Sequence, residues 1–60
     1  MRYIIEVLTH GELIRTEHFS KFEDVRKRIS QIEKESHASH SLLNVVVFED
    51  HVKLFERFFG

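Results

Sequence analysis

Histidines are the residues of this chain whose type and spacing could most readily define a chemical site. His37 and His40 stand three residues apart and His51 lies in a later turn, so three imidazoles could bind a zinc ion. No cysteine is present to complete a zinc set, and loop histidines at this spacing are more often solvated. We therefore predict no metal site and no bound cofactor.

Catalytic residue types are present, but their pattern does not indicate an enzyme. Ser, His, Asp and Glu all occur, yet no nucleophile stands in a recognisable catalytic turn. A chain of 60 residues also rarely encloses a pocket that excludes water. The sequence therefore predicts a protein without enzymatic activity.

A short basic run could contact phosphates, and a fourth cation follows further along: Arg26, Lys27, Arg28 and Lys53. However, nine Lys and Arg against ten Asp and Glu give a formal charge of -1, which is no overall footprint for nucleic acid. A solvated helix face is the simpler interpretation of the run. Nucleic acid binding through these four residues is the alternative that stays open.

The composition predicts one small domain that covers residues 1–60. Apolar residues make up 42% of the chain, so a core can form, but domains of this size are marginally stable alone. Without disulfides, stability must come from efficient packing or self-association. The N-terminal apolar stretch is interrupted by Arg2 and Glu6 and is too short for a membrane span or a signal core. We expect a cytoplasmic protein that does not bind membranes.

Two β-rich runs, residues 2–8 and 13–19, predict an N-terminal hairpin. His10 and Gly11 would form a two-residue loop, because glycine accepts the positive φ that such loops require. In that register Tyr3, Ile5 and Val7 form the core face, with Ile5 opposite Thr16 and Val7 opposite Ile14.

A helix should follow, starting at Ser20, whose hydroxyl could form a capping box with Glu23. Apolar residues then recur at helical spacing and should pack on the sheet: Phe22, Val25, Ile29 and Ile32. The pattern fades in the polar segment 36–41, where we expect a loop.

The most apolar segment, residues 42–59, predicts a second hairpin with a two-residue loop at Asp50 and His51. One face of that hairpin would carry Leu43, Val45, Val47, Leu54 and Phe58. The other would carry Leu42, Val46, Phe48, Phe55 and Phe59. Both faces are apolar, although a sheet covered on one side usually alternates apolar and polar residues.

The order β-β-α-β-β predicts an α+β fold, a four-stranded sheet with one helix packed across one face. With a strand from Met1, a turn at Leu8-Thr9-His10-Gly11 and a helix start at Phe22-Glu23-Asp24-Val25, the chain resembles the β-grasp fold of ubiquitin-like proteins and the immunoglobulin-binding domain of protein G. The resemblance implies a mixed sheet whose first and last strands lie parallel in its centre. The chain departs from both functional patterns, since it lacks a Gly-Gly tail and a strand Trp.

One helix can cover only one side of this sheet, so apolar residues should remain on the other side. These are Ile4, Leu8, Leu13, Val46, Phe48, Phe55 and Phe59. We predict a protein-interaction module that forms a homodimer and binds or inhibits a partner protein through this face or an edge strand, as small phage or bacterial inhibitors do. A different register in residues 42–59 would turn some of these side chains inward.

Overall fold

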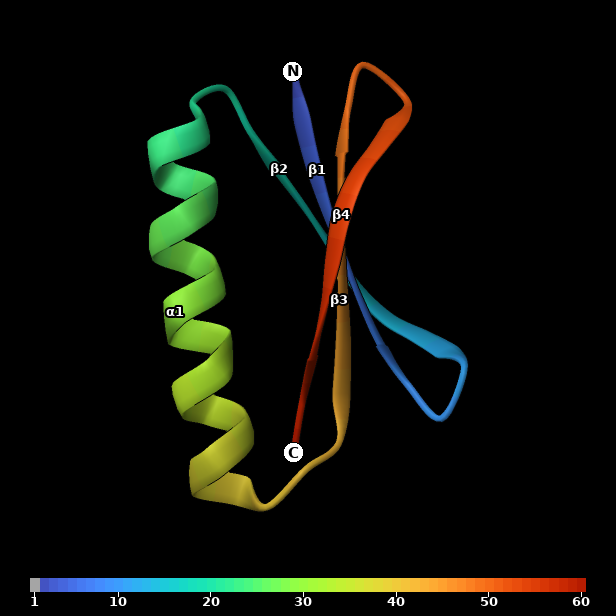
Figure 1. Ribbon diagram of the computed structural model, residues 1–60, viewed down its shortest axis with the longest axis vertical. Helices are drawn as coiled ribbons and strands as arrows, with labels where there is room; N and C mark the ends of the chain where they lie inside the picture. Colours follow the sequence, from blue (N-terminus) through green and yellow to red (C-terminus); the bar gives the residue numbers. More distant parts are fainter. Residues whose placement is uncertain (1) are drawn as a thin grey trace.

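The computed structural model describes residues 2–60 and contains one sheet and one helix (Figure 1). The elements in chain order are β1 (Tyr3–Thr9), β2 (Glu12–Phe19), α1 (Phe22–Ser39), β3 (Leu43–Glu49) and β4 (Val52–Phe59). The predicted α+β class and the order β-β-α-β-β are confirmed. The predicted strand start at Met1 lies outside the described residues.

The strands lie in the order β2-β1-β3-β4, and every neighbouring pair is antiparallel. The central pair is β1 and β3, with Ile5 opposite Val47. The predicted mixed sheet with parallel first and last strands is therefore wrong. After α1, only residues 40–42 connect to β3, so the chain turns at once and runs back along the sheet beside β1 (Figure 1).

Both hairpins close through two-residue loops at the predicted positions. His10 and Gly11 have φ values of 51° and 79°, and Asp50 and His51 have values of 49° and 69°. Positive φ at both loop residues matches the twist of the flanking strands. Glycine occupies only one of these four positions, so the other three residues accept a conformation that side chains disfavour.

The first hairpin contains a β-bulge in β2, which changes the predicted register. Ile14 is the extra residue, because Leu13 and Arg15 lie opposite consecutive residues of β1. Beyond the bulge, Ile5 lies opposite Glu17 and not Thr16. A bulge moves the following residues of its strand to the other face.

The second hairpin contains a corresponding bulge in β4, at Leu54. Phe55 consequently lies opposite Val47 and Phe59 opposite Leu43, so both phenylalanines face the helix. The predicted placement of Phe55 and Phe59 on the uncovered face is wrong for this reason.

The helix begins one residue later than predicted. Lys21 is the N-cap, and no side chain makes a capping hydrogen bond there, so the predicted capping box of Ser20 with Glu23 does not form. Phe22 lies at the edge of the helix–sheet contact with 38% of its surface exposed. Within residues 2–60, no helix is long and apolar enough to cross a membrane.

The helix also extends to Ser39, through residues predicted to form a loop. Ser36 is fully buried, and its hydroxyl donates to the carbonyl of Ser41, which ties the last turn to the connection before β3. His40 ends the helix with a φ of 54°. Tertiary packing, rather than local helix preference, stabilises this last turn.

The core lies between α1 and one face of the sheet (Figure 1). Its fully buried side chains come from the helix and the two central strands: Val25, Ile32, Ile5, Val7, Val45 and Val47. Partly buried residues pack around them: Tyr3, Phe19, Ile29, Leu43, Phe55 and Phe59. The opposite sheet face has no helix over it.

Candidate protein-interaction surfaces

We call the sheet face opposite α1 the open face. The register assigns to it Ile4, Glu6, Leu8, Leu13, Thr16, His18, Asn44, Val46, Phe48, Lys53, Glu56 and Phe58. Ile4 lies opposite Phe48, and Leu8 lies opposite Leu13. Apolar side chains from all four strands therefore share this face.

Five of the seven residues predicted to bind a partner lie on the open face: Ile4, Leu8, Leu13, Val46 and Phe48. Phe55 and Phe59 do not, because the bulge at Leu54 turns them toward α1. The bulge instead places Phe58 on the open face, opposite Asn44 and 74% exposed. Phe58 is not among the residues predicted to bind a partner, because no residue type in β4 signals the bulge.

The open face carries charges of both signs among its apolar side chains. Val46 lies between two acidic residues, Glu6 on β1 and Glu56 on β4. The ammonium of Lys53 donates to Glu56 Oε1 at 2.7 Å, and this bond lowers the pKa of Glu56 below its ordinary value. Glu6 has no Lys, Arg or His nitrogen among residues 2–60 within salt-bridge distance.

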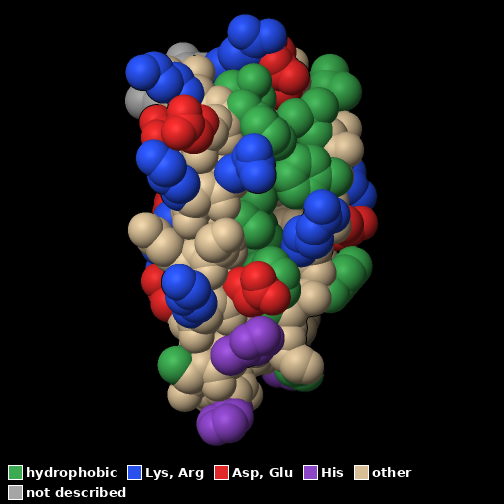
Figure 2. Space-filling view, turned by 60° about the vertical axis from the view of Figure 1, so that its left-hand side comes forward, with side chains coloured by type: hydrophobic (Ala, Val, Ile, Leu, Met, Phe, Trp, Pro, Cys, Tyr) green, Lys and Arg blue, Asp and Glu red, His purple; other side chains and the backbone are tan. Residues whose placement is uncertain are grey.

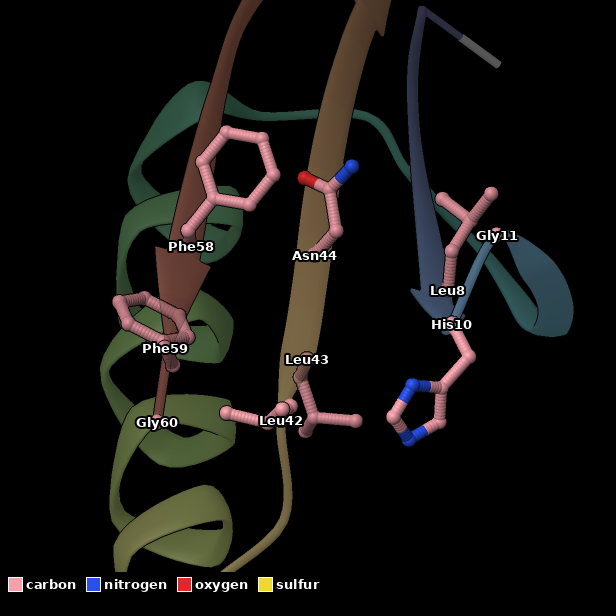
Figure 3. Close-up of a pocket in the computed structure, with 9 residues that line it drawn as sticks. All are labelled: Leu8, His10, Gly11, Leu42, Leu43, Asn44, Phe58, Phe59 and Gly60. Carbon is pink, nitrogen blue, oxygen red and sulfur yellow. The ribbon is translucent and has the colours of Figure 1, made fainter.

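A surface depression lies at the end of the sheet next to the loop between β1 and β2 (Figure 3). It is lined by that loop, the end of β1, the start of β3 and the end of β4. In Figure 3, Asn44 stands between Leu8 and Phe58, and its buried amide oxygen has no hydrogen-bond partner in the described part of the chain. Leu43 and Phe59, which face the helix, also line it. The depression thus wraps around the sheet end rather than enclosing a ligand, and binding sites for small molecules are usually enclosed.

On the helix side, the flank of α1 next to β2 is closed by a cluster of ion pairs. Arg28 donates from Nε to Glu17 Oε1 at 2.7 Å and from a terminal nitrogen to Oε2 at 2.9 Å. Glu35 lies 3.2 Å from Arg28, and Arg15 lies 3.0 Å from Glu17. The hydrogen bonds from Arg28 lower the pKa of Glu17, and they raise the pKa of Arg28.

The flank of α1 next to β4 is different, and we call the groove there the β4 groove. It is lined by Phe22, Arg26 and Ile29 of α1 and by Phe55 and Arg57 of β4. Figure 2 shows apolar side chains running between helix and sheet, with Lys or Arg side chains on both sides. The two arginines have no carboxylate within 4.0 Å among the residues that the structure describes. Sequence reasoning missed this groove because it depends on the bulge in β4.

The four residues predicted to contact nucleic acid do not form one surface. Arg28 is bound to Glu17 on the β2 flank, and Lys27 lies 3.6 Å from Glu23. Lys53 is on the open face and paired with Glu56, whereas Arg26 lines the β4 groove. Only Arg26 of the four has no acidic partner in the described part of the chain.

The three histidines considered as zinc ligands lie at the end of α1 and in a loop, whereas His18 lies in β2 and His10 in the first hairpin loop. His37 and His40 line a depression near Leu42 and Gly60, and His51 lies in the β3–β4 loop. Among residues 2–60, no group of three His, Cys, Asp or Glu side chains could hold a metal ion.

Comparisons with known proteins give no family: neither a family model, nor a curated protein, nor a solved structure matches this chain significantly.

Proposed function

We propose that this protein is a non-enzymatic protein-interaction module that forms a homodimer through its open face. The observation that carries the proposal is the set of apolar side chains on the open face. Leu13 and Phe58 are exposed, Ile4, Leu8 and Phe48 are partly exposed, and Val46 lies among them with only 9% of its surface exposed. Polar residues interrupt these side chains, but monomers rarely leave several large apolar side chains together on a sheet face in contact with water, and such faces usually bind another protein.

The size of the domain favours a second copy as the occupant. Among residues 2–60, only six apolar side chains are fully buried in the core, and the sequence contains no cysteine for a disulfide. Small domains without staples often gain stability by oligomerisation. Four strands about 4.8 Å apart and about 23 Å long give a face of about 450 Å² in projection. This area is smaller than the roughly 800 Å² per partner of a standard interface and falls in the range of weak complexes, so we expect dimerisation at micromolar concentration.

The charges of the open face also suit self-association. Glu6 and Glu56 are acidic, whereas Lys53 and His18 supply cationic or titratable groups on the same face. A two-fold dimer brings each surface against itself, so a face with both signs can pair its own charges. A partner with a single strong charge would gain less from this face.

Sedimentation velocity from 1 to 100 µM tests the proposal. We expect the wild type to dimerise within this range, and Phe58→Asp and Leu13→Asp to remain monomeric with unchanged circular dichroism. Val52→Asp is the matched control, because Val52 is exposed and apolar but lies opposite Glu49, off the open face. A folded wild-type monomer at 100 µM, or equal loss of dimer in the control, would overturn self-association.

Nucleic acid binding is the rival function, and the dispersed positions of its residues disfavour it. Filter binding of a single-stranded oligonucleotide at low salt should give no retention. Retention with a steep negative dependence on salt would instead support phosphate contacts.

A further inference from the structure

The two flanks of α1 differ in how their charges are paired. On the β2 flank, Glu17 and Glu35 neutralise Arg15 and Arg28. On the β4 flank, Arg26 and Arg57 face the groove, and neither has an acidic partner within 4.0 Å among residues 2–60. Arg57 donates one hydrogen bond to the backbone carbonyl of Glu56 at 3.3 Å, but neither guanidinium group has a carboxylate partner among these residues. Two such groups at one groove favour an anionic ligand, which arginine can bind through two parallel hydrogen bonds.

The floor of the β4 groove is aromatic. The rings of Phe22 and Phe55 meet edge to face with centroids 6.4 Å apart, and Phe22 is partly exposed. The guanidinium of Arg57 lies 4.8 Å from the centre of the Phe55 ring. This stacking holds Arg57 along the groove, so its hydrogen-bond donors are oriented before a ligand binds. The groove thus suits a ligand with an apolar side chain and a carboxylate close together.

The backbone beside the groove is also available. β4 is an edge strand, so its outer N–H and C=O groups have no neighbouring strand. The bulge at Leu54 interrupts the first half of β4, but residues 55–59 keep a regular register with β3. Unpaired edge strands accept an additional strand from another chain.

We propose that the β4 groove binds an extended acidic segment of another protein, which adds to the sheet as a fifth strand along residues 55–59. Alternate residues of a strand face the same side about 6.6–7 Å apart. An apolar residue of the segment packs on Phe22 and Phe55, and an acidic residue two positions away binds Arg26 and Arg57.

Two carboxylates lie near this flank: Glu23 lines a surface depression together with Arg26, and Glu33 follows further along α1. Glu33 lies one helical turn beyond Ile29 on the same side of α1. It repels a carboxylate at that end of the groove, so the acidic residue of the segment binds between the two arginines. This inference goes beyond homodimer formation, because the groove lies on the helix side of the sheet.

Fluorescence anisotropy with a labelled probe of sequence Thr-Ile-Thr-Ile-Thr-Glu-Thr-Glu tests the proposal. We expect saturable binding at 20 mM salt that weakens at 500 mM, because salt screens exposed charges. A probe with Lys in place of Glu should bind at least tenfold more weakly. Absence of saturable binding of the acidic probe up to 1 mM would overturn the proposal.

Charge-reversal variants separate a specific groove from a general effect of net charge. Arg26→Glu and Arg57→Glu should each weaken binding of the acidic probe at least tenfold, and the double variant should prefer the Lys probe. Lys34→Glu is the matched control, since Lys34 is exposed on the far side of α1 and makes the same charge change. Equal weakening in the control would contradict the proposed site.

Two further measurements determine where the probe binds and whether the groove prefers peptide or nucleic acid. Nuclear magnetic resonance shifts on adding the acidic probe should be confined to β4 and the first half of α1, and shifts confined to the open face would overturn the site. An oligonucleotide that displaces the probe and binds more tightly would assign the groove to nucleic acid instead. Phe58→Asp should still bind the probe, so failure of the homodimer and failure of this groove are distinguishable.

Discussion

Arg28 of α1 binds Glu17 of β2 through two parallel hydrogen bonds of 2.7 and 2.9 Å. The two residues are eleven positions apart in the chain. Because one lies on α1 and the other on the edge strand β2, the pair holds the helix against the sheet. Both side chains are only 20% exposed, so water screens the pair less than it screens the other ion pairs of the surface. The pair therefore stabilises the fold, and it occupies two of the hydrogen-bond donors of Arg28.

We expect Glu17→Gln to lower the free energy of unfolding by about 1–2 kcal/mol at pH 7, because it removes the charge from a bidentate pair. The folded pKa of Glu17 is below its ordinary value of 4.5. The stabilisation is thus complete above that value and is lost as pH falls through the folded pKa.

Urea unfolding at pH 7 and pH 3 measures this effect. The difference between wild type and Glu17→Gln should shrink at the lower pH. Glu33→Gln, which removes an exposed carboxylate without an ion pair in the described residues, should change stability little at either pH. An undiminished difference at pH 3 would contradict the pair's role.

The second prediction concerns the face to which each phenylalanine of β4 belongs. Phe55→Ala should cost about 2 kcal/mol in a dilute monomer, because Phe55 packs against the core. Phe58→Ala should change monomer stability by less than about 0.5 kcal/mol, because Phe58 is exposed. Chemical denaturation below 1 µM compares the two variants, and the reverse order of costs would show that Phe58, and not Phe55, packs against the helix.

The core face of β1 could be predicted from the sequence, whereas the faces of Phe55 and Phe58 could not. The alternation of Ile5 and Val7 in β1 predicts the core face correctly, and both loop positions follow from turn residues and hairpin length. Ile14 and Leu54 are ordinary strand residues, so nothing in their type predicts that each becomes a bulge. Since a bulge reverses the faces of all later residues in its strand, Phe55, Phe58 and the β4 groove could not be placed from sequence.

Strand order and helix length were beyond sequence patterns for a different reason. β3 and β4 are both highly apolar, so composition does not select which one pairs with β1. Ser36 belongs to the polar segment 36–41, which predicts a loop. It is instead buried in the last turn of α1, where its hydroxyl donates to the carbonyl of Ser41. Only the packed structure supplies that acceptor.

The third prediction uses the strained loop between β3 and β4. His51 has a φ of 69°, a conformation that costs a side chain about 1–2 kcal/mol and costs glycine little. We expect His51→Gly to raise the free energy of unfolding by about 0.5 kcal/mol, after the extra flexibility of glycine in the unfolded chain is counted.

Gly11→Ala is the inverse control for this loop effect. Gly11 has a φ of 79°, and an added Cβ would meet no atom within 4 Å. Any loss of stability in Gly11→Ala is therefore conformational, and we expect about 1 kcal/mol. Thermal unfolding measures the change in stability of both variants. If His51→Gly is less stable than the wild type, the imidazole of His51 makes a contact that compensates for the strained backbone.

The last prediction follows from the proposed homodimer. A dimer that forms only from folded chains makes apparent stability depend on protein concentration, since association withdraws folded monomer from the unfolding equilibrium. The wild-type melting temperature should rise between 2 and 200 µM. Phe58→Asp should melt at one temperature over that range, because the exposed apolar ring that it removes lies on the open face and outside the core. A concentration-independent wild type would mean that this 60-residue domain is stable without a second copy, and that its open face tolerates water.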